Sequence, residues 1–306
     1  MLLAALAAVA AVRYTIRRRR VFNLCDKVVL VTGGSRGLGL LLAREFTNRG
    51  AKVCICSRDK VELEAARVDL AKRGATVFAY CCDVTSLEQV KSLIDAVREK
   101  LGEVDVLVNN AGAVQAGPME EMRISDYEDA MRVHFWAPLY ATLEVLPAMR
   151  RRRQGRIVNV SSIGGKVSVP HLLPYSASKF ALVGLSEGLR SELMTDNIFV
   201  TTVCPGLMRA GNTQIADFVG RNEDEYPLFA FSDAFPMTAL RADTAARQVV
   251  EATIHGDAEI VLSVPARIAT IARALFPEPM SETLAFVNQA FPASGKDEET
   301  GERPED

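Results

Sequence analysis

The sequence has no excess of basic charge and no CxxC pair of cysteines. Its 306 residues contain 36 Lys and Arg against 38 Asp and Glu, which gives a formal net charge of −2. A dedicated nucleic-acid-binding protein is normally basic, so no nucleic-acid partner is expected. None of the six cysteines lies in a CxxC pair, and most lie in apolar runs typical of strands. Buried, reduced thiols are therefore favoured over a disulfide framework, and no metal site is predicted.

A long hydrophobic run is also missing. The apolar segment Met1 to Val12 would span about 18 Å as a helix, short of a hydrocarbon core of roughly 30 Å. Arg13 and the arginines at 17–20 follow this segment, whereas a secretory signal carries its basic residues first. Two interpretations stay open: an N-terminal anchor that keeps the rest of the chain on the cytoplasmic side of a membrane, or a short helix docked on the protein's own surface. We expect a cytoplasmic protein, associated with the cytoplasmic face of a membrane under the first interpretation.

What the sequence does contain, from Lys27 onwards, is a regular alternation of two kinds of segment. Nearly continuous apolar runs, typical of strands covered on both faces, are found at 27–32, 52–56, 75–81, 104–108, 156–161, 199–203 and 259–262. Segments with helical periodicity separate them, at 38–49, 60–73, 87–101, a long stretch to about 152, 175–194 and 244–255. This alternation predicts βαβ units in an α/β fold, a single doubly wound parallel-sheet Rossmann domain with a C-terminal helical extension.

The chain divides into four predicted segments. They are an apolar and Arg-rich N-terminus at 1–20, the Rossmann dinucleotide-binding and catalytic domain at 21–264, a helical extension at 265–292 and a charged disordered tail at 293–306. Within the domain, residues 207–240 show no clean period but hold several aromatic side chains between Phe218 and Phe235. We interpret them as an irregular flap, serving either as a lid over an apolar substrate or in ordinary packing. The apolar stretch Ala266 to Phe276 is expected to pack in the core, with a membrane surface or a partner subunit as the alternatives.

The first predicted strand leads directly into a glycine-rich loop that opens a helix. Glycines permit a tight turn and a close approach of the backbone to a pyrophosphate, while the helix N-terminus supplies free N–H groups. The strand, loop and helix together predict a dinucleotide site. Its loop residues are Gly33, Ser35, Arg36, Gly37, Leu38 and Gly39.

The end of the second predicted strand indicates which dinucleotide is preferred. A Rossmann site for NAD carries an acid there to hold the ribose 2′-hydroxyl, but this strand ends Cys56-Ser57-Arg58. The guanidinium of Arg58 suits a 2′-phosphate, and Arg36 adds a second cation, so NADP is favoured over NAD. Asp59 complicates this prediction, because a shift of one residue in register would supply an acid.

A tyrosine and a lysine four residues apart mark the candidate catalytic helix. Tyr175 and Lys179 fall on one helical face, and a nearby ammonium favours phenolate, which would lower the pKa of Tyr175. Ser162, thirteen residues upstream at a strand end, is a candidate hydroxyl partner for a substrate carbonyl. Asn110 follows the fourth predicted strand, at the sheet edge where such folds bind ligands.

Together these motifs resemble the short-chain dehydrogenase/reductase family. The matching pieces, in the family's order, are TGGSRGLG at 32–39, Asp83-Val84, NNAG at 109–112, Ser162, Tyr175 with Lys179, and Pro205-Gly206. The resemblance implies that Tyr175 is the general acid/base, that Ser162 orients the carbonyl or hydroxyl, and that Lys179 binds the nicotinamide ribose and lowers the pKa of Tyr175. It also implies that Asp83 and Val84 flank the adenine, that Asn110 lies by the adenosine ribose, and that Pro205, Gly206 and Met208 lie beside the nicotinamide.

Two positions depart from the family's pattern. Where the family usually carries an Asn that holds a water in a proton relay, this sequence has His134. Imidazole could bind the same water, so His134 is included among the catalytic candidates, with a satisfied core histidine as the alternative. The family's Thr after Pro-Gly is Ala210 here, and Thr213 is a candidate substitute.

The sequence thus predicts an NADP(H)-dependent oxidoreductase of the carbonyl reductase type, which interconverts an apolar ketone and a secondary alcohol. The alternative is a non-catalytic NADP-binding protein of the same fold with a redox-sensing or interaction role. The partners expected are an apolar small-molecule substrate and further copies of the chain, in a dimer or tetramer.

Overall fold

The computed structural model describes residues 11–12, 14–74, 76–209 and 240–289. The expected aromatic lid, Ala210, Thr213 and the charged tail lie outside the described residues. The seven strands of the main sheet are β1 (Val28–Thr32), β2 (Lys52–Ser57), β3 (Val77–Cys81), β4 (Val106–Asn109), β5 (Gly155–Val160), β6 (Ile198–Pro205) and β9 (Glu259–Leu262). All neighbours are parallel, in the order β3-β2-β1-β4-β5-β6-β9. The order reverses between β1 and β4, and this switch point is where open α/β sheets bind ligands.

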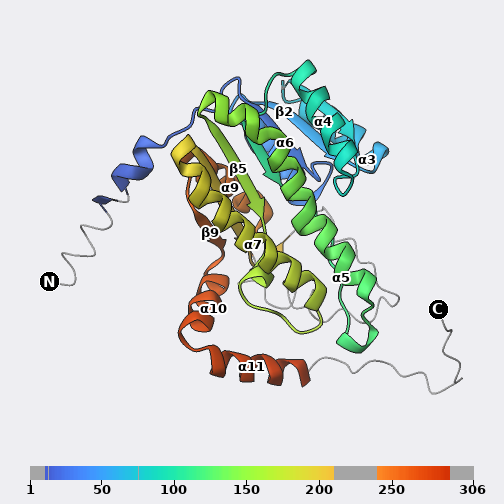
Figure 1. Ribbon diagram of the computed structural model, residues 1–306, viewed down its shortest axis with the longest axis vertical. Coiled ribbons are helices and arrows are strands. Elements are labelled where there is room, and N and C mark those ends of the chain that lie inside the picture. Colours follow the sequence, from blue (N-terminus) through green and yellow to red (C-terminus); the bar gives the residue numbers. More distant parts are fainter. Residues whose placement is uncertain (1–10, 13, 75, 210–239, 290–306) are drawn as a thin grey trace, which may run out of the picture.

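Helices cover both faces of the sheet (Figure 1). They are α2 (Gly37–Asn48), α3 (Lys60–Ala71), α4 (Leu87–Lys100), α5 (Ile124–Met131), α6 (Ala137–Arg152), α7 (Leu173–Leu193) and α9 (Ala242–His255). Helices α10 (Val264–Leu275) and α11 (Pro277–Gln289) then extend from the last strand. A short parallel pair, β7 (Met208–Arg209) with β8 (Leu240–Arg241), lies apart from the main sheet.

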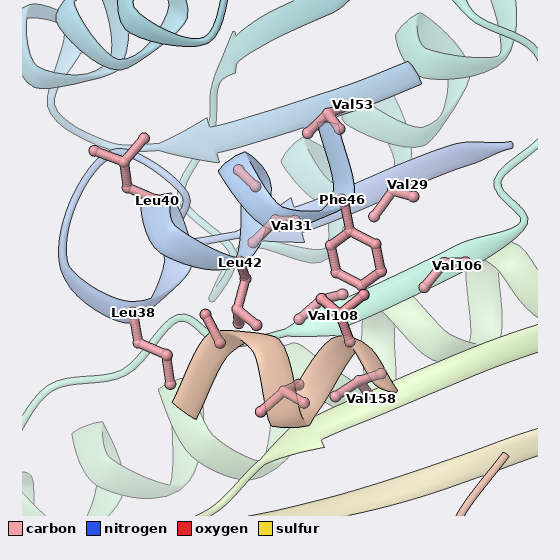
Figure 2. Packing of buried hydrophobic residues seen from close by; sticks show 14 of the residues in the cluster. Val29, Val31, Leu38, Leu40, Leu42, Phe46, Val53, Val106, Val108 and Val158 are labelled. Atoms are coloured by element: carbon pink, nitrogen blue, oxygen red, sulfur yellow. The ribbon is translucent and has the colours of Figure 1, made fainter. Parts of the chain in front are cut away.

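The strands alternate their buried side chains between two cores. Val29 and Val31 of β1 pack with residues of α2, α3 and α9, whereas Val28 and Leu30 pack with residues of α4 and α6. Figure 2 shows the first of these cores, where Phe46 of α2 lies among strand valines. Because each face needs apolar side chains, the strands are apolar throughout, as expected for a parallel sheet covered on both sides. The predicted fold class is confirmed.

The long helical stretch before β5 is not continuous. Residues Arg132–Trp136 form a π-helical turn between α5 and α6. Such turns are inserted into α-helices frequently at functional sites. This one carries His134, and its side chain is buried.

Contacts with the folded domain reach a few residues before its predicted boundary at residue 21. Phe22 and Leu24 are buried in the α2–α9 core. The guanidinium carbon of Arg156 lies 4.7 Å from the ring centroid of Phe22, and its Nη2 donates to the carbonyl of Arg20 at 2.6 Å. Arg17 forms a two-point ion pair with Asp257 at 2.9–3.0 Å. The residues after about Arg17 therefore belong to the domain. The polar and basic sequence of this segment did not indicate these contacts.

Two packing expectations need correction. Cys25 and Cys81 are exposed. The prediction of buried thiols therefore holds only for Cys54, Cys56, Cys82 and Cys204. Helix α10 does not enter the core as favoured above, because Ala266 is its only buried residue. Among the described residues, no helix has the length and apolar character needed to cross a bilayer.

Candidate active site

The glycine-rich loop lies folded against the loop that follows β4. Gly33 has φ +63°, and a Cβ placed on it would lie 2.9 Å from the Cα of Ala111. The side-chain amide of Asn110 donates to the carbonyls of Thr32 and Gly33, both at 3.1 Å. Only glycine fits this approach, and α2 begins four residues later, at Gly37. The loop and helix N-terminus therefore have the form that receives a pyrophosphate, and these residues fit a dinucleotide.

Asp59 caps the helix that follows β2. Strand β2 ends at Ser57, and Asp59 is the N-cap of α3. Its Oδ1 accepts from the backbone N–H groups of Val61 and Glu62 at 2.8 and 2.9 Å. The carboxylate thus accepts hydrogen bonds from the first turn of α3, as an N-cap side chain usually does. Arg58 is exposed beside it.

Glu62 contacts the glycine-rich loop at the same end of the site. Ser35 Oγ donates to Glu62 Oε2 at 3.2 Å, and Arg36 Nε lies 3.7 Å from that oxygen. Both side chains of the ion pair are about 40% exposed, so their attraction is largely screened by solvent. The two cations expected to favour a 2′-phosphate therefore lie at an open edge with one acid among them.

Asp83 and Val84 follow β3, as predicted for residues beside an adenine. Asp83 Oδ1 accepts from the N–H and the hydroxyl of Thr85 at 3.0 and 2.8 Å. Its own N–H donates to Gln89 Oε1 at 2.9 Å. These bonds fix the turn into α4. Val84 packs against the core on the α4 side.

Ser162 and Tyr175 lie together where β5 and α7 meet. Ser162 comes two residues after β5, and its Oγ accepts from the N–H of Gly164 at 3.0 Å. A hydrogen bond between the side chains of Ser162 and Tyr175 lowers the pKa of Tyr175, but burial, the larger cause, raises it above its ordinary value. The structure thus brings together the two groups expected to hold a substrate oxygen.

Lys179 lies one turn further along α7, with only 4% of its surface exposed. Its Nζ donates to the carbonyl of Val160 at 2.9 Å and lies 5.6 Å from the centroid of the Tyr175 ring. Burial lowers the pKa of Lys179 to about 7. The predicted lowering of the Tyr175 pKa by this lysine is therefore not seen. Near neutral pH the buried amine is only partly charged, and burial dominates at the phenol.

His134 bridges two segments and has both ring nitrogens occupied. Its side chain is 1% exposed. Nε2 accepts from the N–H of Ala113 at 3.3 Å, so the proton of the neutral ring belongs on Nδ1, which lies 2.8 Å from Ser178 Oγ. Ser178 Oγ in turn donates to the carbonyl of Tyr175 at 2.8 Å. Burial, with a smaller contribution from Lys179, holds the pKa of His134 well below its ordinary value, so the ring is neutral. It meets the Tyr175 ring edge-on, with centroids 5.4 Å apart.

A chain of hydrogen bonds joins buried polar side chains of three strands to α7. Asn109 Nδ2 donates to Asn159 Oδ1 at 2.8 Å, and Asn159 Nδ2 donates to Ser186 Oγ at 3.1 Å. Thr202 Oγ1 donates to the same Ser186 oxygen at 2.7 Å. This chain links β4, β5 and β6 to α7. This hydrogen-bonded chain was not predicted from the sequence, although isolated polar residues in otherwise apolar strands could have indicated it.

Gly206 lies where β6 meets the start of α10. Its N–H donates to the carbonyl of Leu262 at 3.2 Å, and a Cβ there would lie 2.7 Å from Ser263 Oγ and 3.0 Å from the Cβ of Ala266. Pro205 is the last residue of β6, and Met208 pairs with Leu240 in the small two-stranded sheet. The residues expected beside a nicotinamide therefore adjoin the C-terminal extension.

The sequence profile of the short chain dehydrogenase family matches residues 27–220. The chain belongs to this family. The match spans both the glycine-rich loop and the helix of Tyr175 and Lys179, and the protein is accordingly an oxidoreductase of the class that acts on carbonyl and alcohol groups with a nicotinamide cofactor.

Similar proteins agree with this family. A 3-ketodihydrosphingosine reductase of Mus musculus is 33% identical over 234 residues, covering 75% of this chain and 69% of that protein. A short-chain dehydrogenase structure from Streptomyces avermitilis superposes with a TM-score of 0.72 at 29% identity, covering 86% of this chain and 98% of the other. The structure of actinorhodin polyketide ketoreductase with NADPH superposes with a TM-score of 0.69 at 32% identity, covering 77% and 95%.

Proposed function

We propose that this short-chain dehydrogenase uses NADP(H) to interconvert an apolar ketone and a secondary alcohol, with Tyr175 as the general acid/base. The observation that carries the proposal is the grouping of Ser162, Tyr175 and Lys179 between β5 and α7. A non-catalytic NADP-binding protein, the alternative function, would have no need of all three groups in one place. A ketoreductase with NADPH and a 3-ketodihydrosphingosine reductase among the similar proteins support the same activity.

Each catalytic group has a distinct task in the reductive direction. Ser162 and Tyr175 donate hydrogen bonds to the substrate oxygen and stabilise the negative charge that develops on it. Tyr175 then transfers its phenolic proton to the alkoxide. Lys179 holds the nicotinamide ribose, and its ammonium stabilises the phenolate that remains. The bound cofactor supplies the hydride, a task that no protein side chain performs.

The cofactor would be held along the carboxyl edge of the sheet. The glycine-rich loop receives the pyrophosphate, Asp83 and Val84 flank the adenine, and Asn110 lies by the adenosine ribose. Pro205, Gly206 and Met208 lie beside the nicotinamide. Further groups are drawn from the end of β2 and from α7. The proposed set of residues is Gly33, Ser35, Arg36, Gly37, Leu38, Gly39, Ser57, Arg58, Asp83, Val84, Asn110, Tyr175, Lys179, Pro205, Gly206 and Met208.

The preference for NADP rests on the end of β2. A 2′-phosphate needs donors and positive charge, which Ser57, Arg58 and Arg36 supply. Two acids lie nearby: Asp59 caps the first turn of α3, and Glu62 faces Ser35 and Arg36. The charge that remains available at this edge therefore favours the phosphorylated cofactor.

His134 acts in this proposal by positioning, not by transferring protons. Its neutral ring joins the N–H of Ala113 to Ser178 and, through that hydroxyl, to the backbone of Tyr175. A group whose two nitrogens are already bonded within the protein has no free site for a relay water. Of the two interpretations left open by the sequence, the geometry favours the satisfied histidine.

A direct assay tests the reductase proposal. Purified full-length protein is offered NADPH with a panel of ketones of increasing chain length, and NADPH oxidation is followed by absorbance. We expect turnover that grows with the apolar length of the ketone and that requires Tyr175. Tight NADPH binding with no turnover on any member of the panel would favour the non-catalytic alternative.

The protein is further proposed to work at the cytoplasmic face of a membrane, as a dimer or tetramer. The apolar segment 1–12, followed by basic residues, supports the first point. Because Arg17 and Arg20 are bonded to the domain, a shortened chain that begins at Arg17 keeps these contacts and loses the apolar segment together with residues 13–16. It should co-sediment with anionic vesicles less than the full chain does. Equal sedimentation of the two chains would contradict the anchor.

A further inference from the structure

Helix α10 combines an apolar sequence with an unusual lack of burial. It leaves the last strand of the sheet and, with α11, lies outside the body formed by the sheet and its covering helices (Figure 1). Four of its residues, spaced as i, i+4, i+7 and i+11, fall on one side of the helix. They form what we call the α10 face: Val264, Ile268, Ile271 and Leu275, each between 59% and 65% exposed. Among the described residues, nothing covers this face.

The α10 face is bordered by positive charge. Arg267 lies beside it, and α10 contains no acid. The second arginine of the helix, Arg273, lies on the opposite side, towards Phe180. Helix α11 differs, since it carries Glu278 and Glu282. Of these two helices, only α10 thus combines an exposed apolar face with a basic neighbour and no acid.

The start of α10 also shares a pocket with the N-terminal segment. Arg17, Arg247 and Arg267 line one open pocket, together with Glu251 and Asp257. Both acids already have arginine partners, since Asp257 binds Arg17 and Glu251 binds Arg49. The basic N-terminal arm and the start of α10 therefore lie on the same side of the molecule.

We propose that the α10 face rests on an anionic lipid surface, as a second membrane contact besides the N-terminal segment. Apolar side chains would enter the boundary of the acyl chains, while Arg267 at the edge of the face would meet the lipid phosphates. A second copy of the chain fits less well. A helix of 12 residues offers a face on the order of 200 Å², whereas a stable protein interface buries about 800 Å² on each partner. Two α10 helices would also bring like charges together.

This contact would place the active site next to the membrane. Ala266, the buried residue of α10, abuts Gly206 beside the proposed nicotinamide site. The guanidinium carbon of Arg273 lies 5.8 Å from the ring centroid of Phe180, the residue after Lys179. An apolar substrate dissolved in the lipid would then have a short path to Tyr175. This last consequence rests on the proposed function, but the lipid contact itself does not.

The single tryptophan of the chain allows a direct test by fluorescence. Trp136→Phe removes the native signal, and Ile271→Trp places a new one on the α10 face. A matched protein carries Trp136→Phe with Val61→Trp, at an exposed position on α3. Both full-length proteins are mixed with vesicles of phosphatidylserine and phosphatidylcholine, with and without brominated acyl chains. We expect bromolipid to quench the residue-271 signal at least twofold and the residue-61 signal hardly at all.

Three results would overturn the proposal. One is an unquenched signal at residue 271 while the protein sediments with the vesicles. A second is an emission already shifted to the blue before lipid is added, which would show that a segment of the chain covers the face. The third is a residue-271 signal that changes with protein concentration in step with the oligomeric mass, which would identify a second copy as the partner.

A charge substitution gives an independent readout. The full-length double variant Ile268→Glu with Ile271→Glu should bind anionic vesicles about tenfold more weakly than the native chain, because burial of these two side chains is replaced by repulsion. The control Val61→Glu should bind as the native chain does. Turnover on a water-soluble ketone should stay within twofold in both variants. Unchanged vesicle binding by the double variant would contradict the lipid contact. Neither binding assay depends on turnover, so failure of the lipid contact leaves the proposed reductase intact, and the reverse holds as well.

Discussion

The two ends of the carboxyl edge of the sheet are built in opposite ways. At the end formed by β5 and α7, Lys179 and His134 are buried, and their nitrogens are bonded within the protein. At the end formed by β2 and α3, Arg58 is exposed and Arg36 faces Glu62 across an open surface. Buried polar groups are strongly fixed because leaving them unpaired is costly, whereas exposed ion pairs contribute little. The groups proposed to perform the chemistry are thus prearranged, and the proposed cofactor preference depends on exposed side chains with weaker interactions.

The largest effect is expected at the buried end. Tyr175→Phe removes the transferable proton and little volume, so turnover should fall at least about 10²-fold while NADPH affinity stays within a few fold of native. Steady-state assays with NADPH titrations check both numbers. Tyr140→Phe, which removes a phenol oxygen on α6 away from the site, serves as the control. Retained turnover in the Tyr175 variant would show that another group supplies the proton.

A smaller effect concerns the pH dependence of stability. The folded-state pKa of Lys179 is lowered from 10.5 to about 7 by burial. Between these values the unfolded chain binds a proton that the folded chain does not, so this group makes the free energy of unfolding rise with pH. From pH 7 to pH 9 the rise should be about 2 kcal/mol, and Lys179→Met should abolish it.

Denaturant unfolding of the cofactor-free protein at several pH values measures this difference. Lys166→Met is the control, because Lys166 pairs with Glu259 and should not alter the slope in this window. Equal slopes in the native chain and the Lys179 variant would mean that the ammonium is solvated in the folded protein.

At the exposed end, formed by β2 and α3, we expect an effect of about tenfold on cofactor affinity. We expect NADPH to bind at least tenfold more tightly than NADH, roughly 1.4 kcal/mol, and Arg58→Asp to shrink or reverse that ratio. Arg67→Asp on the neighbouring helix is the matched control, since Arg67 pairs with Glu64. Dissociation constants for both cofactors, measured at two salt concentrations, check the prediction. Equal affinities in the native protein would remove the basis for assigning NADP.

The smallest effect is expected at His134. An Asn side chain reaches about as far as the Nδ1 position, so His134→Asn should keep the bond to Ser178 and lose only the one to Ala113. Turnover should fall less than about fivefold, which is about 1 kcal/mol, with an unchanged pH profile. A loss beyond 10²-fold together with a shifted pH profile would identify His134 as a proton carrier.

Much of this architecture could be predicted from the sequence because it depends on local patterns. Apolar runs and helical periodicity located the strands and helices, and the motifs around Tyr175 and Gly33 located the site. The cap formed by Asp59 was also readable, since an acid before a helix with Glu62 three residues later is an N-terminal signature.

Other features depend on contacts between distant residues. Phe22 is buried among residues far away in the chain and lies against Arg156, and the basic sequence around it gives no sign of this burial. The partners of His134 come from the loop after β4 and from α7, so a single residue position could not reveal them. The sequence predicted an apolar α10 but placed it in the core, because periodicity shows that a face is apolar and not what covers it.

We propose that this protein transfers a hydride to a ketone carbon while Tyr175 protonates the oxygen. The most direct measurement uses NADPH carrying deuterium at C4 on its transferable face, with the most active ketone of the panel and mass spectrometry of the product. We predict that one deuterium appears on the carbinol carbon with native protein and that Tyr175→Phe forms at least 10²-fold less of this product. An alcohol without deuterium, or labelled product formed equally by the two proteins, would contradict the account.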